Sequence, residues 1–228
     1  MVRESIAEFS IGSALDVVNE PLVHLGDAIL AARDLLCRSG LFGGTAGDVS
    51  VRIPGADAIL ISPLVPFVLQ LATVDLLEVT LEGRILHRRA RPTSSAKMHL
   101  AVYRERSDVH AIVHSRAPFV TLLGICDVPI PPVTVDAIPF SDIPRVAVRA
   151  GESQAWPEQV AAALASGPVA ALLHHEGMVM LGAEPQEAAT RAMALEETAR
   201  ILVLSQLLKQ MPCTLPPEVV DTLKQDWL

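Results

Sequence analysis

The sequence predicts an α/β protein in which helices cover both faces of a mixed sheet. Segments with helical spacing of apolar residues alternate with short apolar runs, and the strands come as hairpins rather than as repeated strand–helix–strand units. The chain has 228 residues, of which 50% are hydrophobic and 19% charged, so it can build a sizeable core and is not intrinsically disordered. We expect a single domain over 1–228, with an N-terminal arm at 1–20 and a C-terminal tail at 213–228.

The first predicted elements are one helix and two hairpins. Apolar residues recur at helical spacing over 21–40, where a Ser-Gly pair ends the helix. Strands are expected at 48–53 and 58–62, joined by Pro-Gly-Ala-Asp, and at 77–81 and 84–87, joined by Glu-Gly.

The middle of the chain predicts a helix, a strand and a second helix. The helix over 94–106 can begin with Ser94 or Ser95 as the cap of its free amides. The apolar run at 111–113 indicates a buried strand that ends at polar residues. Pro118 suits the first turn of the helix that follows.

The C-terminal half begins with an irregular segment. Prolines interrupt 128–148, which therefore has room for one short strand only. A helix over 157–165, strands at 170–173 and 178–181, and a long helix over 185–211 complete the expected elements.

Composition excludes several classes of protein. The chain carries 18 basic and 26 acidic residues, a net charge of −8, which repels nucleic-acid phosphates. Apolar stretches such as Pro63–Leu71 are too short to cross a bilayer, and charged residues interrupt the N-terminus where a secretory leader would be apolar. We therefore expect a cytoplasmic protein with neither nucleic acid nor membrane as a partner.

The three cysteines and the aliphatic content bear on packing. Cys37, Cys126 and Cys213 are far apart and odd in number, so we expect no disulfide framework and treat each as a small buried hydrophobe. Mean hydropathy is +0.40 although only 4% of residues are aromatic. This aliphatic surplus is typical of a buried subunit interface, and a large core gives the same value.

Two segments have the composition of anion-binding turns. The glycine-rich stretch 43–48 contains Thr45, Gly47 and Asp48, and its backbone amides can approach an anion closely. It lacks the lysine and trailing helix of a nucleotide-binding loop, and taken alone it is more often an ordinary turn. Ser94 and Ser95, at a predicted helix start, can bind an anion, although capping is the commoner role.

Two further segments place polar residues at the ends of buried strands. His114 and Arg116 are two residues apart, so they face the same way if the strand continues through them. The same rule puts His174 and Glu176 on one face. A lone histidine is usually structural, but two such clusters suggest a site.

In this order, these segments resemble the class II aldolase/adducin family, which includes sugar-phosphate aldolases and an epimerase. The resemblance covers roughly 22–208 and implies an α/β/α sandwich with a central mixed, mainly antiparallel sheet. It rests on six segments: GGTAGDVS at 43–50, ISP at 61–63, PTSSAKMHLAVY at 92–103, VHSRAP at 113–118, LLHHEGMVMLG at 172–182 and the helical stretch at 187–199.

The resemblance also implies which functional positions differ. Family aldolases hold zinc with three histidines, of which His114 is retained, whereas Arg116 and Glu176 occupy the other two positions. Ser95 replaces the catalytic glutamate. Asp48 replaces an asparagine that helps to hold the substrate phosphate, and an apolar Leu-Val pair at 64–65 replaces the polar residues of a second turn.

These changes favour a site without metal. Arg116 carries a permanent positive charge that opposes a cation beside it, and Glu176 is a natural bidentate partner for that guanidinium. The alternative is a rebuilt set of His114, His174 and Glu176, a combination that suits zinc or iron. A carboxylate at Asp48 would also repel a substrate phosphate.

Three functional readings follow. The first is a lyase or isomerase that acts on a non-phosphorylated carbonyl or carboxylate compound through an enolate. The second is a metal-dependent decarboxylase or oxygenase, and the third is a non-catalytic, adducin-like assembly protein. An open pocket would favour the first, and a buried His114 the third. The first assigns catalysis to His114, Arg116, Glu176 and Ser95, and substrate binding to Thr45, Gly47, Asp48 and Ser94. The resemblance further implies a homotetramer.

Overall fold

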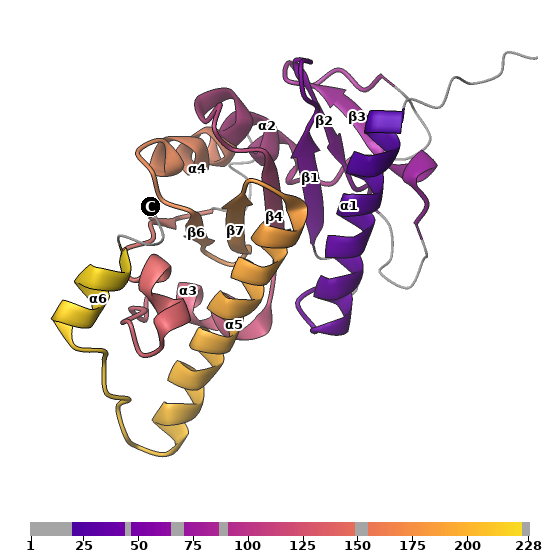
Figure 1. Ribbon diagram of the computed structural model, residues 1–228. Coiled ribbons are helices and arrows are strands. Elements are labelled where there is room, and N and C mark those ends of the chain that lie inside the picture. The colour runs from indigo at the N-terminus through magenta and orange to yellow at the C-terminus, as the bar shows by residue number, and fades with distance from the viewer. Residues whose placement is uncertain (1–19, 44–46, 65–70, 87–90, 149–154, 225–228) are drawn as a thin grey trace, which may run out of the picture.

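A seven-stranded sheet organises the protein. We describe the computed structural model of the chain over 20–43, 47–64, 71–86, 91–148 and 155–224. The sheet order is β3-β2-β1-β4-β7-β6-β5, and every neighbouring pair is antiparallel except β5 and β6 (Figure 1). The strands are β1 (Asp48–Arg52), β2 (Ala58–Ile61), β3 (Leu77–Thr80), β4 (Ala111–Ser115), β5 (Arg145–Val146), β6 (Ala170–Leu173) and β7 (Gly177–Gly182).

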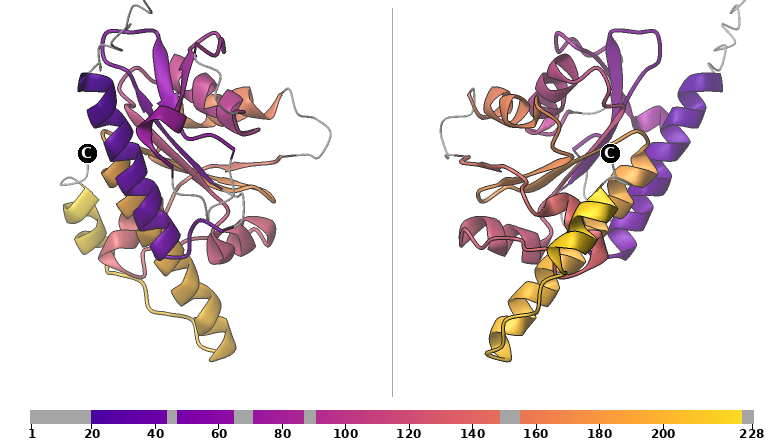
Figure 2. Two further views of the ribbon diagram at one scale, coloured as in Figure 1. Left: turned by 90° about the vertical axis from the view of Figure 1, so that its right-hand side faces the viewer. Right: turned by 60° about the vertical axis from the view of Figure 1, so that its left-hand side comes forward.

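Helices cover both faces of this sheet. Figure 2 shows α1 (Glu20–Arg38) and α5 (Pro185–Leu207) on one side, and α2 (Ala96–Glu105) and α4 (Trp156–Leu164) on the other. The helix α3 (Pro118–Ile125) shares the hydrophobic core of α1 and α5. Along β7 successive side chains enter different cores, because strand residues alternate between the two faces. The predicted α/β/α sandwich with a mixed, mainly antiparallel sheet is confirmed.

The second strand of one predicted hairpin and the end of the long C-terminal helix differ from the structure. The strand expected at 84–87 is reduced, over its described residues, to one bridge between Val79 and Ile85. The helix expected over 185–211 ends at Leu207, because Lys209 has a φ of 55°, a left-handed conformation that ends helices.

The segment expected to be irregular contains more structure than one strand. A 3-10 helix, η2 (Val135–Phe140), lies in this segment before β5. Outside the segment, a second 3-10 helix, η1 (Thr73–Asp75), precedes β3. The predicted C-terminal tail contains α6 (Pro217–Lys224), which packs against η2 and buries Val220. Most of the predicted N-terminal arm lies outside the described residues.

The cysteines are less buried than expected. All three are free, but Cys126 and Cys213 are exposed and Cys37 is only partly buried. The prediction of buried cysteines was wrong because Cys126 follows the last turn of α3, and Cys213 lies between α5 and α6. No helix among the described residues has the length and apolar content needed to cross a membrane.

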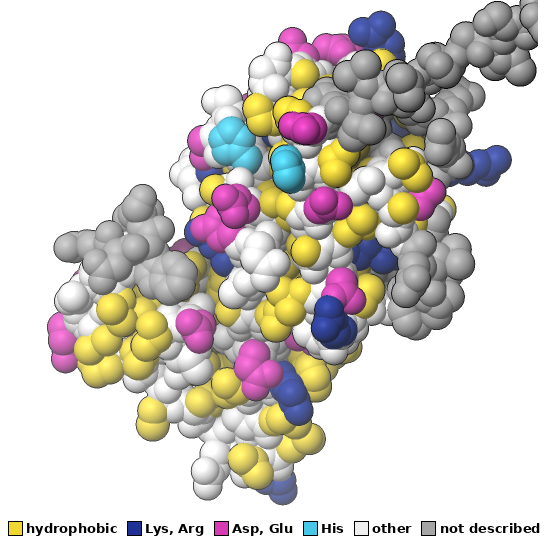
Figure 3. Space-filling view, turned by 45° about the vertical axis from the view of Figure 1, so that its right-hand side comes forward, with side chains coloured by type: hydrophobic (Ala, Val, Ile, Leu, Met, Phe, Trp, Pro, Cys, Tyr) yellow, Lys and Arg dark blue, Asp and Glu magenta, His cyan; other side chains and the backbone are white. Residues whose placement is uncertain are grey.

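The end of α5 extends past the sheet and is apolar. Figure 3 shows hydrophobic side chains on the lower part of the molecule, where α5 ends in Figure 1. We call the exposed side chains at this end the α5 tip; they are Leu204, Leu207, Leu208 and Met211.

Candidate active site

Asp48 and His114 lie opposite each other on neighbouring strands. The antiparallel register of β1 and β4 pairs the two residues directly. Their side chains are almost completely buried, with residue exposures of 1% and 2%. Asp48 Oδ2 lies 3.7 Å from His114 Nδ1. The sheet register therefore sets the centre of the candidate site.

The start of α2 adds two more side chains to Asp48. Ser95 Oγ donates a hydrogen bond to Asp48 Oδ2, and His99 Nε2 lies 2.6 Å from Asp48 Oδ1. The second contact is a close approach without good hydrogen-bond geometry, because neither atom has a hydrogen-bond partner among the described residues. Ser95 occupies the N-cap position of α2 but makes no capping bond with its side chain. Its predicted capping role was wrong because its hydroxyl turns inward to Asp48.

The carboxyl group of Asp48 is held in its ionised form. Burial alone would raise its pKa, but the charge of His99 and the proximity of His114 outweigh burial and hold the pKa well below its ordinary value. Asp48 is thus a buried anion surrounded by a hydroxyl group and two imidazoles.

A second layer of polar side chains lies behind His99. Ser50 Oγ is 2.7 Å from His99 Nδ1 and 2.9 Å from the Tyr103 hydroxyl, and all three side chains are buried. Burial raises the pKa of Tyr103 above its ordinary value. Sequence reasoning missed this layer. Ser50 is two residues after Asp48 on a strand, so spacing alone could have found it. His99 is four residues after Ser95 on a helix, but its closeness to Asp48 depends on how that helix packs on the sheet.

Arg116 and Glu176 form the predicted pair. Arg116 donates from Nε and Nη2 to Glu176 Oε2, over 2.8 and 2.5 Å. Both side chains are about one-third exposed. His114 Nε2 lies 2.9 Å from the backbone oxygen of Glu176, so His114 and Arg116 both contact this residue. β4 ends at Ser115, so Arg116 lies beyond the strand and the alternation expected along it does not apply.

The backbone around Glu176 explains its position. His175 and Gly177 have φ values of 62° and 83°, so the chain turns sharply between β6 and β7. A Cβ at Gly177 would collide with the carbonyl oxygen of Ser115, which only glycine avoids. This close approach brings Glu176 next to the end of β4.

The residues offered as metal ligands do not fit a metal ion. His174 Nε2 lies 3.1 Å from Asp127 Oδ1, Glu176 pairs with Arg116, and His114 Nε2 faces a carbonyl oxygen. The expectation that His174 and Glu176 share a face was wrong, because this segment is a turn with no strand alternation. Among the described residues, no group of three or more His, Cys, Asp and Glu side chains is arranged to hold a metal.

The other predicted binding residues lie apart from Asp48 or have local roles. Thr45 lies outside the described residues. Gly47 has a φ of 125°, and a Cβ there would collide with the ring of Phe42. Ser94 lines a separate cavity of about 420 Å³ together with Thr93 and Lys97. Asp48, Arg116 and Glu176 do not line this cavity.

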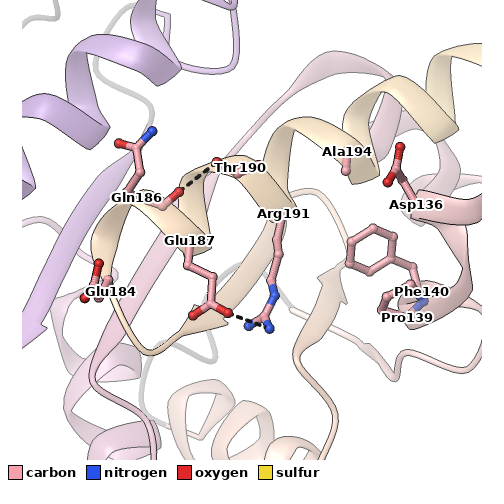
Figure 4. A pocket seen from close by; sticks show the side chains of 9 residues that line it. All are labelled: Asp136, Pro139, Phe140, Glu184, Gln186, Glu187, Thr190, Arg191 and Ala194. Atoms are coloured by element: carbon pink, nitrogen blue, oxygen red, sulfur yellow. Dashed lines mark hydrogen bonds and ion pairs between the residues drawn. The ribbon is translucent and has the colours of Figure 1, made fainter. Parts of the chain in front are cut away.

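A cavity of about 400 Å³ lies between η2 and the start of α5 (Figure 4). Arg191 ion-pairs with Glu187 over 2.8 Å at its edge and also donates to the carbonyl oxygen of Leu181. Glu176 precedes the start of β7 and α5 follows its end, and the strand between them is about 17 Å long. This cavity therefore contains none of the predicted site residues.

Comparisons with known proteins assign the chain to a family. Residues 27–203 match the family model described as the class II aldolase and adducin N-terminal domain. The 5-methylthioribulose-1-phosphate/5-deoxyribulose-1-phosphate aldolase of Rhodospirillum rubrum is 35% identical over 179 residues, which cover 78% of this chain and 79% of the relative. The 3-oxo-tetronate 4-phosphate decarboxylase of Haemophilus influenzae is 29% identical over 172 residues, which cover 72% and 79%.

Solved structures agree with this assignment at the level of the fold. An L-fuculose 1-phosphate aldolase superimposes with a TM-score of 0.79 and 22% identity, over 90% of this chain and 96% of the other. The relatives named here are aldolases and a decarboxylase, which are lyases. The chain belongs to the class II aldolase and adducin family.

Proposed function

We propose that this chain is a lyase that acts on a small carbonyl or carboxylate compound without a phosphate group. The reaction passes through an enolate, and Arg116 supplies the positive charge that a metal supplies elsewhere in the family. The observation that carries the proposal is the pair of Arg116 and Glu176, held at the end of β4 next to His114. We further propose a cytoplasmic homotetramer.

Arg116 has the properties needed to stabilise an enolate. A guanidinium has five N–H donors, and the contacts with Glu176 use those on Nε and Nη2. The group remains charged at any physiological pH, and about one-third of its side chain is exposed. A fixed donor aimed at a developing oxyanion is usually a large term in catalysis.

Glu176 is the base in this proposal. Its carboxylate takes the proton of a substrate hydroxyl group, the neighbouring C–C bond breaks, and the electron pair moves onto the carbonyl oxygen as an enolate. Arg116 stabilises that oxygen. Return of the proton to the enolate carbon completes the cleavage, so Glu176 acts as base and then as acid. His114 can supply the same proton transfer, but it is far more buried than Glu176.

Residues at two positions support a substrate without a phosphate group. Leu64 is 47% exposed and apolar where the family resemblance has a polar turn. Asp48 puts a negative charge where the resemblance has an amide. Its partners Ser95 and His99 keep that charge in place.

One competing function has a specific observation in its favour. His114 is only 2% exposed, and this burial is what a non-catalytic assembly protein would show. In that reading Arg116 and Glu176 form a structural bridge between β4 and the β6–β7 turn. A metal-dependent decarboxylase is disfavoured by the contacts that already occupy His114, His174 and Glu176.

Formation of the enolate can be measured directly, because it exchanges the protons next to a carbonyl group for deuterium. The purified chain, treated with a chelator, is incubated in D₂O with pyruvate, dihydroxyacetone or dihydroxyacetone phosphate. Loss of the signals of protons next to the carbonyl is followed by proton NMR, with buffer alone as the blank. We expect exchange above the blank for a non-phosphorylated probe.

Each other outcome of this experiment counts against a stated part of the proposal. Exchange with dihydroxyacetone phosphate only would overturn the claim about phosphate. Exchange that the chelator abolishes, and that added zinc or iron restores, would overturn the role of Arg116. Failure of all three probes would favour the assembly protein.

A further inference from the structure

We infer that Asp48 is a positioning residue, which fixes His114 and, through it, the backbone of Glu176. The inference rests on the proposed function for its catalytic consequence, but its geometry is independent of any substrate. It assigns to Asp48 a role other than binding substrate and to Ser95 a role other than catalysis.

The two ring nitrogens of His114 face different segments of the chain. The backbone oxygen of Glu176 can only accept a hydrogen bond, so the hydrogen of that 2.9 Å contact belongs to His114 Nε2. The opposite nitrogen, Nδ1, lies 3.7 Å from Asp48 Oδ2, and it makes no hydrogen bond to any described residue. Asp48 is therefore the carboxylate that faces the ring on the β1 side, and the backbone oxygen of Glu176 binds the ring on the β6–β7 side.

Asp48 is itself fixed by side chains that do not reach Glu176. Ser95 donates to Oδ2, while His99 approaches Oδ1 and is backed by Ser50. Ser95 Oγ also lies 3.1 Å from Thr93 Oγ1, so this buried hydroxyl group is enclosed by Asp48 and Thr93 and is not free to contact a substrate. These contacts make Ser95 a support for Asp48.

Packing alone does not require a charge at this position. A buried ionic group adds little net stability compared with apolar residues of the same volume, because desolvation opposes its attractions. The same group orients its neighbours strongly, since removing it leaves their polar atoms without a partner. Apolar residues in the place of Asp48 could not orient His114 in this way.

The contact between Ser95 and Asp48 suggests a relocation experiment. Asp48→Asn removes the charge with little change in shape. Adding Ser95→Glu returns a carboxylate to the same place from α2, because the two side chains touch. The matched control is Ser62→Ala, which removes another buried hydroxyl that bonds to β1, at the backbone N–H of Val49.

The first readout needs no substrate. The full chain is labelled with ¹⁵N-histidine, and the ring nitrogens are recorded by NMR at one fixed pH. His114 is assigned by the loss of its signals in His114→Gln. We expect Asp48→Asn to shift the His114 signals, the double variant to return them toward their original positions, and Ser62→Ala to leave them in place. Unchanged His114 signals in Asp48→Asn would overturn the inference.

The second readout is proton exchange with the most reactive probe. Misplacement of a reacting group by about 1 Å can cost about 100-fold in rate, so we expect a loss of that order in kcat for Asp48→Asn with KM little changed. Recovery of exchange together with the His114 ring signals in the double variant supports positioning. Recovery of exchange without those signals overturns it, because Ser95→Glu also restores the glutamate that the family resemblance has at this position. An exchange rate in Asp48→Asn equal to wild type overturns it.

The two readouts separate failure of this inference from failure of the proposed function. A wild-type chain without exchange contradicts the proposed function, and the ring signals then decide the role of Asp48. If the double variant does not fold, Asp48→Asn and Ser62→Ala alone still give the decisive comparison of His114 signals.

Discussion

Arg116 donates from both Nε and Nη2 to a single oxygen of Glu176, which leaves Oε1 of that carboxylate outside the contact. The pair joins two segments that are 60 residues apart in sequence. A carboxylate oxygen that makes no contact with Arg116 therefore lies next to a permanent positive charge. This arrangement suits the removal of a proton coupled to formation of an enolate.

The role of Arg116 can be tested by separating activity from stability. We expect Arg116→Met to reduce proton exchange by about 100-fold or more, the usual effect of removing an oxyanion donor. The free energy of unfolding should change by less than about 1 kcal/mol, because partly exposed ion pairs contribute little. Exchange and urea unfolding measure the two effects. Arg200→Met, at an exposed arginine of α5, is the control and should change neither. Equal exchange in both variants would contradict the role.

The charge of Arg116 also predicts the metal content of the protein. We expect the wild-type chain, dialysed against zinc and then against buffer, to retain far less than one zinc per chain by plasma mass spectrometry. Arg116→His should bind more, because it removes the opposing charge and adds an imidazole ligand near His114. Arg116→Lys keeps the charge and serves as the control. About one zinc per wild-type chain would make the prediction wrong.

The buried anion at Asp48 predicts how stability depends on pH. A carboxyl group whose pKa is lower in the folded state stabilises the protein above its unfolded pKa of about 3.9, and this contribution is lost as the pH falls through the folded pKa. We expect Asp48→Asn to cost about 3 kcal/mol at pH 7, as for a broken buried pair. The difference from wild type should shrink below about pH 4.

Urea unfolding at several pH values, over the range where both proteins stay folded, measures this difference. Ser62→Ala is the control, because it removes a buried hydroxyl group without a charge. Its cost should be the same at each pH. A constant difference between wild type and Asp48→Asn across the range would contradict the prediction.

The fold was predictable because its signals are local. Alternation along β7 and helical spacing in α1 follow from which side chains enter a core, and both can be read in a window of ten residues. The errors arose where one backbone angle or one contact decides the outcome. Lys209 ends α5 by its left-handed φ, and Ser95 turns from its cap position toward Asp48.

The candidate site was predictable only in part. Opposite charges indicated the pair of Arg116 and Glu176. The spacing rule failed at His174, because residues 174–176 form a turn whose His175 is left-handed. His99 was missed because it lies in an apolar helix, and its closeness to Asp48 depends on how α2 packs on the sheet.

The turn that carries Glu176 predicts a steric requirement at Gly177. We expect Gly177→Ala to destabilise the protein by more than about 2 kcal/mol, because the new Cβ meets the carbonyl oxygen of Ser115 in addition to an unfavourable φ. Gly55→Ala is the matched control. Gly55 has a similar φ of 74°, but a Cβ there meets nothing within 4 Å. Gly55→Ala should lower the free energy of unfolding by only about 1 kcal/mol, because the unfavourable φ is its sole penalty.

Thermal and urea unfolding of the two glycine variants measure the steric part as a difference. Gly177→Ala should also weaken proton exchange, since any relief of the collision moves Glu176 away from Arg116. Equal destabilisation by the two substitutions would show that the approach of Gly177 to β4 is not required.

The α5 tip predicts self-association. Leu207 and Leu208 are 76% and 73% exposed and lie with Met211 at a helix end that extends beyond the sheet. Exposed apolar side chains grouped in this way are typical of an interface between subunits. We expect sedimentation of the wild-type chain at micromolar concentration to give a mass well above the 24.4 kDa of one chain, and four chains per particle if the homotetramer proposal is right.

Charges at the α5 tip should lower this mass. Leu207→Glu combined with Leu208→Glu would bury two unpaired carboxylates in the interface, which is costly enough to dissociate it. Val74→Glu is the control, because Val74 is 60% exposed on η1 and is not part of the tip. A wild-type monomer at this concentration would contradict self-association. A variant that keeps the wild-type mass would place the interface elsewhere on the chain, because two buried charges could not leave a contact at the tip intact.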